Sequence, residues 1–416
     1  MTRNIAPCVV ILAAAAAAAN PTYNKDIAPI LYQHCAECHR PGEVAPFSLL
    51  SYQETVKRAA LIASVTRARV MPPWKAEPGH GEFRDVRRLS EEQIALIQQW
   101  AKNGAPEGDA ADKPAPPRFT NGWLLGQPDR IVAMPAKFAV PPDGPDQFRC
   151  FVILLNLEKD QFIGAVEFRP DDRRTVHHAL VFTDVTGQAR QLAAADGSYN
   201  CFGGPGFPAG LLGGWAPGTV PVKPMPGYAV TLRQGTDLVI QIHYHPSGKP
   251  SQDQSSLGLF YSDAPTHGRT VMIVGTQAID IAPGDSHYVV KASRLIPADT
   301  EVVRITPHAH YLCKDMKVTA QLPDGTSLPL IWIKDWDFNW QGSYTYAAPV
   351  KIPKGTRIEM EYTYDNSEGN PRNPSHPPVR VTYGEQTTNE MGLVFLGLAL
   401  PTPADVVAFQ KALMGR

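Results

Sequence analysis

Apolar residues recur at helical spacing in the first quarter of the chain and at strand spacing afterwards. The clearest helical segment is LSEEQIALIQQWAKNG, which starts at residue 89. Its apolar stripe consists of Ile94, Ile97 and Trp100. Ser90 can cap this segment because Gln93 follows three residues later. DIAPILYQHC and SYQETVKRAALIASVTRA have the same spacing, so residues 20–108 are predicted to form an α-helical domain.

Residues 109–118 are rich in Ala, Pro and Asp and are predicted to form a linker. Beyond it, short strand-like runs alternate with Pro, Gly and Asp turns, as in RCFVILLNL, VHHALVF, DLVIQIHYH and EVVRITPHAHYL. Regularly spaced short strands are typical of β-sandwiches, and nearly 300 residues is generous for one. The predicted fold is multidomain: the α-helical domain, then two mainly-β, jelly-roll-like sandwich domains over 119–265 and 266–416.

The first residues, MTRNIAPCVVILAAAAAAANP, have the layout of a secretory signal peptide over 1–19. The apolar run is short for a membrane span, and no other stretch approaches that length. We therefore expect an exported protein, periplasmic or extracellular, without a membrane span. With 39 Lys and Arg against 40 Asp and Glu and no long runs of like charge, no nucleic-acid partner is expected.

The helical region contains a haem-attachment motif. Cys35, Cys38 and His39 stand in the C-x-x-C-H arrangement, in which two thiols bond the haem vinyl groups and the histidine supplies an axial imidazole. No second CxxC follows and no βαβ pattern surrounds the motif, which disfavours a zinc site or a redox dithiol. Met71 is the predicted sixth ligand and His80 the alternative. The region resembles a class I-like cytochrome c domain, so we expect haem c and electron transfer.

The β region contains three pairs of histidines. They are His177 and His178, His243 and His245, and His308 and His310. The last two pairs share a face if the chain is extended, because their members are two residues apart. His177 and His178 reach one metal ion if a bulge turns the strand or if they bind through different ring nitrogens. Imidazole suits zinc, copper, iron or nickel, and a soft third ligand such as Met391 narrows the choice toward copper.

In order and context these motifs, together with GGWAPGTVP at 213–221, resemble the copper type II, ascorbate-dependent monooxygenases. That is the family of peptidylglycine α-hydroxylating monooxygenase and dopamine β-monooxygenase. The resemblance implies two copper ions, one held by His177, His178 and His243 and the other by His308, His310 and Met391. It also implies two β-sandwiches with one copper on each, facing a solvent cleft, and a disulfide between Cys150 and Cys201. Cys313 has no counterpart in this pattern and is either a buried structural thiol or a perturbation of the second site.

The implied activity is hydroxylation of a C–H bond with dioxygen, with oxygen activated at the His308, His310 and Met391 copper. Relatives take electrons from ascorbate, whereas we expect this chain to receive them through its haem from an external ascorbate-like or respiratory donor. Peptide-amidating members hold a peptide carboxylate with Arg, Asn and Tyr. The corresponding positions here are Thr306, Leu393 and Phe395. A less polar small organic substrate is therefore expected.

Trp336, Phe338 and Trp340 share a face if their segment is extended, and they line either a pocket or a sandwich core. Two other functions remain open. One is a non-catalytic haem and copper protein for electron transfer or copper binding. The other is an extracellular binding module whose histidines are structural.

Overall fold

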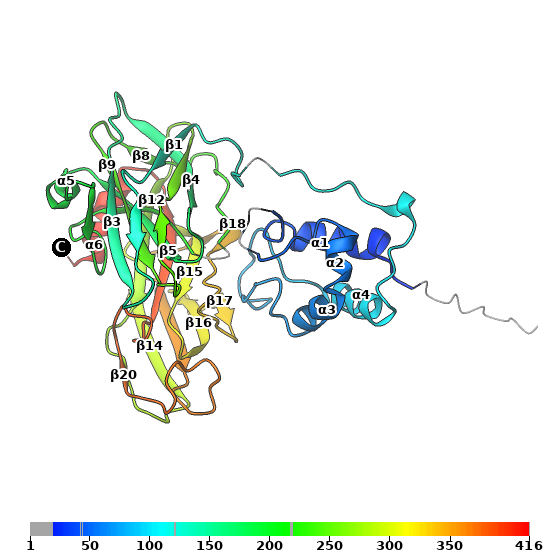
Figure 1. Cartoon of the computed structure of the whole chain (residues 1–416). Coiled ribbons are helices and arrows are strands. Elements are labelled where there is room, and N and C mark those ends of the chain that lie inside the picture. The colour runs from blue at the N-terminus through cyan, green and yellow to red at the C-terminus, as the bar shows by residue number, and fades with distance from the viewer. Residues whose placement is uncertain (1–19, 42, 44, 120–121, 217–218, 416) are drawn as a thin grey trace, which may run out of the picture. The chain divides into compact units, whose positions relative to one another are not determined.

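The computed structural model describes residues 20–41, 43, 45–119, 122–216 and 219–415 (Figure 1). The predicted signal peptide lies outside these residues, as do Pro217 and Gly218 of the WAPG segment. The chain divides into two compact units. Unit 1 consists of the described residues up to Pro72 together with Arg88–Pro117. Unit 2 consists of Pro73–Arg87 and the chain from Arg118 onward.

Unit 1 is built from short helices. They are η1 (Tyr23–Ile27), α1 (Ala28–His34), α2 (Tyr52–Val56), α3 (Ala59–Arg67), α4 (Glu91–Lys102) and η2 (Ala110–Asp112). The predicted capping box at Ser90 and Gln93 is confirmed, since each side chain bonds the other's backbone N–H. The predicted stripe of α4 is also confirmed, because its three apolar residues are buried in the core of this unit.

The predicted fold class is wrong, because the chain does not form a helical cytochrome c domain over 20–108. Strands account for 35% of the chain and helices for 14%, and the longest described helix, α4, has 12 residues. Residues 73–87 belong to unit 2, where the Glu77 N–H donates to the Trp332 carbonyl at 2.8 Å. Pro73 and Pro78 lie within this stretch and Pro72 directly precedes it, and proline lacks the N–H that a helix interior needs. The spacing of apolar residues predicted the local helices, but it could not show that residues 73–87 belong to unit 2.

The first half of unit 2 contains a five-stranded sheet, β6-β3-β9-β5-β7, a four-stranded sheet, β1-β11-β4-β8, and the pair β10-β2. The strands are β1 (Arg130–Ala133), β2 (Phe138–Val140), β3 (Gln147–Ile153), β4 (Gln161–Arg169), β5 (Val176–Asp184), β6 (Ser198–Asn200), β7 (Gly210–Trp215), β8 (Val230–Leu232), β9 (Asp237–Tyr244), β10 (Ser251–Asp253) and β11 (Ser256–Tyr261), with helix α5 (Gln188–Leu192) after β5. Val181, Ile240 and Leu257 belong to one core that the two larger sheets share. All eight residues of β9 are buried, as expected for a central strand.

The second half of unit 2 contains two four-stranded sheets, β12-β21-β15-β18 and β14-β19-β16-β17, and the pair β13-β20 (Figure 1). The elements are β12 (Gly268–Gly275), β13 (Asp280–Ile281), β14 (Tyr288–Leu295), β15 (Thr300–His308), β16 (Cys313–Gln321), β17 (Ser327–Ile333), β18 (Tyr344–Ile352), β19 (Arg357–Tyr364), β20 (Val381–Thr382), β21 (Leu393–Leu400) and α6 (Asp405–Leu413). Ile305, Leu396, Met316 and Met360 belong to a second core, to which both four-stranded sheets contribute. Each half therefore buries its own apolar residues.

Cys150 on β3 and Cys201 after β6 form the disulfide that the family resemblance implies, with a Cα–Cα distance of 5.7 Å. It links β3 to the residue that follows the edge strand β6 of the five-stranded sheet. Cys150 also pairs with Gln241 of β9 in that sheet. Among the described helices, none is both long enough and apolar enough to cross a membrane.

Candidate metal centre

A β-bulge brings the two adjacent histidines to one side of the five-stranded sheet. Strand β5 pairs with β9 in antiparallel register, with Val176 opposite Tyr244 and His178 opposite His243. The register shifts between Val176 and His178, so His177 is the extra residue of the bulge. In a regular strand His177 and His178 would point to opposite faces. The bulge removes that alternation, and it is the first of the two routes expected from the sequence.

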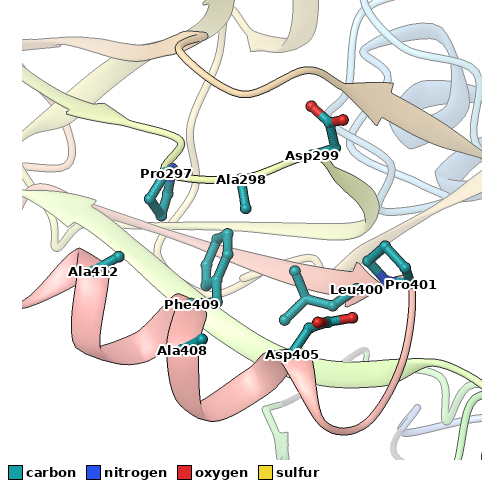
Figure 2. Close-up of a pocket in the computed structure, with 9 residues that line it drawn as sticks. All are labelled: Pro297, Ala298, Asp299, Leu400, Pro401, Asp405, Ala408, Phe409 and Ala412. Atoms are coloured by element: carbon teal, nitrogen blue, oxygen red, sulfur yellow. The ribbon is translucent and has the colours of Figure 1, made fainter.

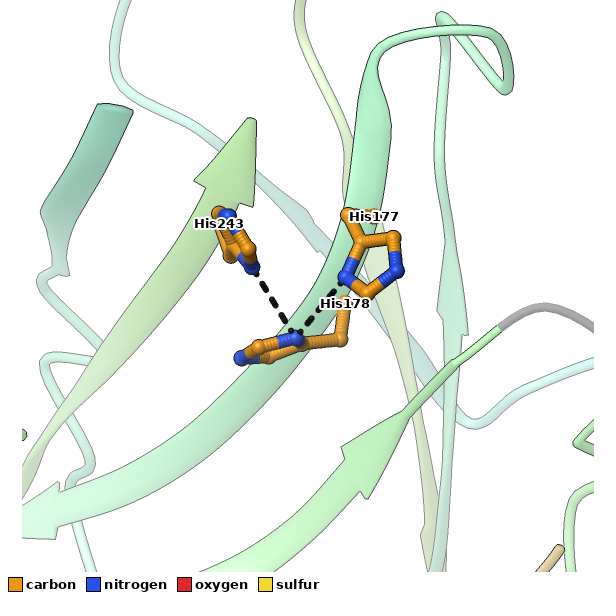
Figure 3. Close-up of side chains that lie close together, drawn as sticks. All are labelled: His177, His178 and His243. Carbon is orange, nitrogen blue, oxygen red and sulfur yellow. Dashed lines mark hydrogen bonds between the residues drawn. The ribbon is translucent and has the colours of Figure 1, made fainter. Parts of the chain in front are cut away.

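The Nδ1 atoms of three histidines converge at this place (Figure 3). Nδ1 of His178 lies 3.3 Å from Nδ1 of His177 and 3.3 Å from Nδ1 of His243. A candidate ligand atom from each of the three lies within 4.8 Å of the others. Nitrogens bound to a tetrahedral ion at 2.0–2.1 Å are themselves roughly 3.3 Å apart. The spacing of these imidazoles therefore fits a metal ion, and we call His177, His178 and His243 the first histidine group.

Asp146 determines which nitrogen of His243 faces the group. Its Oδ2 lies 2.8 Å from His243 Nε2, and its Oδ1 lies 2.7 Å from Nδ1 of His245. Because a carboxylate accepts, Nε2 of His243 carries the proton and Nδ1 keeps its lone pair. Phe148 stacks on the same imidazole at 4.3 Å and 12°. His245 is exposed, so it lies beside the group and not within it, and it shares the Asp146 carboxylate with His243.

Burial keeps His177 and His178 uncharged. It lowers the pKa of His177 to about 3, an effect that His243 reinforces, and it lowers the pKa of His178 well below the usual range. Burial alone would raise the pKa of Asp146, but its hydrogen bonds and charge interactions with His243 and His245 lower it to about 2. Neutral imidazoles at His177 and His178, with an ionised carboxylate at Asp146, suit the binding of a metal ion.

The second histidine group consists of His308, at the end of β15, and His310, two residues later. Their ring centroids lie 5.3 Å apart at 87°. Nδ1 of His308 lies 2.7 Å from Gln341 Oε1, and Nδ1 of His310 lies 3.0 Å from the Asn389 carbonyl. Both partners are acceptors, so each Nδ1 carries the proton and each Nε2 is the available ligand atom.

Glu390 joins the loop of His310 to Met391. The carboxyl group is fully buried and accepts hydrogen bonds from the backbone N–H groups of His310 at 2.9 Å, Met391 at 3.1 Å and Leu312 at 2.6 Å. Tyr364 donates its hydroxyl to the Met391 carbonyl at 2.7 Å. Burial raises the pKa of Glu390 to about 8, although the backbone donors act to lower it. The fold therefore ties the backbones of Met391 and His310, which are far apart in sequence, to one side chain.

Cys313 has the environment of a structural thiol. It is 1% exposed and belongs to the core of the second half of unit 2. Burial and the nearby Glu390 raise the pKa of this thiol well above its usual value. A thiol that stays protonated is a poor metal ligand, so the first of the two interpretations of Cys313 is the one its surroundings favour.

The residues of the predicted haem-attachment motif lie in unit 1, directly after α1. The His39 N–H donates to the Cys35 carbonyl at 2.9 Å, and the Cys35 thiol has its pKa raised to about 12, by burial first and by Cys38 second. Nδ1 of His39 lies 3.1 Å from the Phe47 carbonyl, which leaves Nε2 as the free ligand atom. Met71 belongs to the same unit. His80, the alternative sixth ligand, belongs to unit 2, where its ring meets Trp332 at 4.8 Å.

Several residues that position the histidines were missed by the sequence analysis. They are Asp146, Gln341, Asn389 and Glu390. Asp146 is 97 residues from His243 and Asn389 is 79 residues from His310, and no local pattern connects them. The only signal available was the E-M context of Met391, which placed Glu390 beside a candidate ligand.

A separate cavity of about 380 Å³ lies between α6 and the ends of β15 and β21 (Figure 2). Phe409 and Leu400 form its apolar wall, and Asp299 and Asp405 lie at its side. None of its lining residues belongs to the candidate metal ligands.

Comparisons with known proteins give no close relative. No family model and no curated protein matches the chain. Among solved structures, the major capsid protein P2 of bacteriophage PM2 aligns at 10% identity over 54% of this chain and 99% of its own, with a TM-score of 0.22. PNGF-II aligns at 10% identity over 68% of this chain and 62% of its own, with a TM-score of 0.21. The PBCV-1 virus capsid aligns at 9% identity over 69% and 97%, with a TM-score of 0.24. Scores this low carry no argument about fold or function.

Proposed function

We propose that this protein is an exported copper-dependent monooxygenase. It hydroxylates a C–H bond of a small organic substrate with dioxygen, and an external donor delivers electrons through a haem bound at Cys35 and Cys38. The observation that carries the proposal is the convergence of three imidazole nitrogens, two of the separations being 3.3 Å, at a bulge in β5. The two-residue spacing of His308 and His310 supports a second site, as do the hydrogen bonds from the His310 and Met391 N–H groups to the Glu390 carboxyl group.

Copper, when bound, supplies one-electron redox chemistry and, at the second site, oxygen activation. The chain's own residues prepare both sites. Asp146 holds the proton of His243 at Nε2 and directs Nδ1 to the first group. Gln341 and Asn389 hold the protons of His308 and His310 at Nδ1, so that both present Nε2. The thioether of Met391 is a soft ligand that favours Cu(I) over harder ions.

Haem, when bound, supplies a one-electron carrier. Cys35 and Cys38 would attach it, and His39 would present Nε2 while Nδ1 donates to the Phe47 carbonyl. This hydrogen bond would fix the orientation of the His39 ring when it holds the haem iron. Met71 is the proposed sixth ligand because it lies in the same compact unit as the attachment motif.

A second candidate function is a non-catalytic haem and copper protein. It is favoured by Phe338, which is only 4% exposed and contacts both His177 and His310, because a buried ring between the two histidine groups is a packing contact and not an open substrate site. Oxygen uptake by the fully loaded protein in the presence of a reductant and candidate substrates distinguishes the two functions.

The deciding experiment is metal stoichiometry on full-length protein exported with haem maturation and loaded with copper. We expect two copper ions per haem, falling to one in His308→Ala or Met391→Ala and to one in His178→Ala. Met360→Leu, in the buried core of the same half of unit 2, is the matched control and should retain both. Haem without tightly held copper in the wild-type protein would end the oxygenase proposal.

A further inference from the structure

One aromatic ring contacts both histidine groups. Phe338 lies parallel to the His177 ring, with centroids 4.9 Å apart and an interplanar angle of 20°. The same ring meets His310 at 5.5 Å and 81°. His177 belongs to β5 of the five-stranded sheet and His310 to the loop after β15, so Phe338 connects the two halves of unit 2 at their histidines.

The segment that carries Phe338 is anchored to the second histidine group on both sides of the ring. Two residues earlier, Trp336 donates its indole N–H to the His310 carbonyl at 3.0 Å. Three residues later, Gln341 bonds the His308 imidazole at 2.7 Å. Tyr311, the residue after His310, packs against the Phe338 ring at 4.4 Å. The ring is therefore held in place by the same segment that orients His308 and His310.

The Phe338 side chain is also enclosed. Only 4% of its surface is exposed, so neighbouring atoms pack around the ring and leave little room for water. An aromatic side chain has only two torsions, and pairs of rings favour offset-stacked or edge-to-face arrangements. A flat ring stacked on one imidazole and perpendicular to another is consequently a rigid spacer.

We propose that Phe338 is a positioning residue that fixes the separation of the two histidine groups and keeps solvent out from between His177 and His310. The proposal deepens the proposed function, in which the two metal sites must cooperate, and it departs from the open solvent cleft that the family resemblance implies. The physical contact itself does not depend on bound metal, so it can be tested in the metal-free protein.

The first test is histidine modification by diethyl pyrocarbonate in the metal-free full-length protein, followed residue by residue with mass spectrometry. In Phe338→Ala we expect His177 and His310 to react several-fold faster than in the wild type, while His376, which is exposed, reacts equally in both. Trp340→Ala, an aromatic truncation in the same segment, is the matched control and should leave both rates unchanged. Phe338→Leu keeps most of the apolar volume without a flat ring, and it serves if the alanine variant does not fold.

The second test is the distance distribution between two Cu(II) ions, measured by pulsed electron paramagnetic resonance on the loaded protein. We expect one narrow distribution in the wild type and in Trp340→Ala, and a broader one in Phe338→Leu, with copper stoichiometry unchanged. Unchanged modification rates in the Phe338 variants would overturn the proposal. A wild-type protein that binds no copper would instead end the proposed function, and the modification experiment would still decide the role of Phe338.

Discussion

Asp146 and His243 form a 2.8 Å hydrogen bond that joins the loop before β3 to the central strand β9. The carboxylate accepts from Nε2, so the lone pair of Nδ1 points at His178, 3.3 Å away. The same carboxylate bonds His245 through its other oxygen at 2.7 Å. Asp146, which is not itself a candidate ligand, thus sets the tautomer of His243 and also holds His245 beside the site.

Replacing Asp146 with Ala should weaken metal binding at the first histidine group by about 10–100-fold, because His243 loses the acceptor that fixes its tautomer. Isothermal titration of the metal-free protein with copper measures the change, and the second site should retain its affinity. Asp143→Ala, an exposed carboxylate in the same loop, is the control. Equal affinities in the Asp146 and Asp143 variants would contradict the orienting role.

Replacing Glu390 with Ala should lower the free energy of unfolding by roughly 3 kcal/mol or more, since buried backbone donors lose their acceptor. The affected N–H groups are those of His310, Leu312 and Met391. Glu390→Gln keeps one acceptor oxygen and should cost less. Chemical denaturation measures the stability of both variants. In the glutamine variant, the second site should lose copper while the first site retains it. A glutamine variant with normal stability and two normal copper ions would show that the carboxylate is dispensable.

Removing the Cys150–Cys201 disulfide by a double change to Ala should destabilise the protein by about 2–4 kcal/mol, because the unfolded chain loses a closed loop. The bond joins residues 51 positions apart and lies at the end of the sheet that carries the first histidine group. Denaturation midpoints of the double variant and the wild type measure the cost. Cys313→Ala is the comparison, because its thiol forms no disulfide, and its copper stoichiometry should stay at two.

Asp184 should make stability depend on pH at the end of β5. Burial alone would raise its pKa, but hydrogen bonds from the Ala189, Thr186 and Gly187 N–H groups and the Thr186 hydroxyl lower it. A lowered folded-state pKa means that the stabilisation is present above the unfolded value of about 3.9 and disappears as the pH falls through the folded value.

Asp184→Asn should therefore cost about 1–2 kcal/mol at neutral pH, because an NH2 group replaces one of the two acceptor oxygens and leaves a buried donor without its acceptor. The difference from the wild type should shrink below the ordinary Asp pKa. Urea midpoints for both proteins across this pH range provide the measurement. A difference that stays constant through the acid range would exclude ionisation of Asp184 as its cause.

The sequence by itself determined which residues are candidate ligands for a metal ion or a haem, and much of the local structure around them. The stripe of α4, its Ser90 cap and the short strands follow from spacing and from side chains within one or two turns. The adjacency of His177 and His178 posed the question of how both could reach one ion, and it left two answers open.

Tertiary structure decided between those answers and supplied every orienting contact. The bulge at His177 exists because β5 pairs with β9 in a register that shifts there, and pairing between strands about 60 residues apart is not encoded by local spacing. Asp146, Glu390 and Phe338 reach the histidines only after distant segments have packed. The wrong fold class has the same cause, because local spacing does not show which distant segments pack together. Residues 73–87 belong to unit 2, and the remaining residues of unit 1 form only short helices.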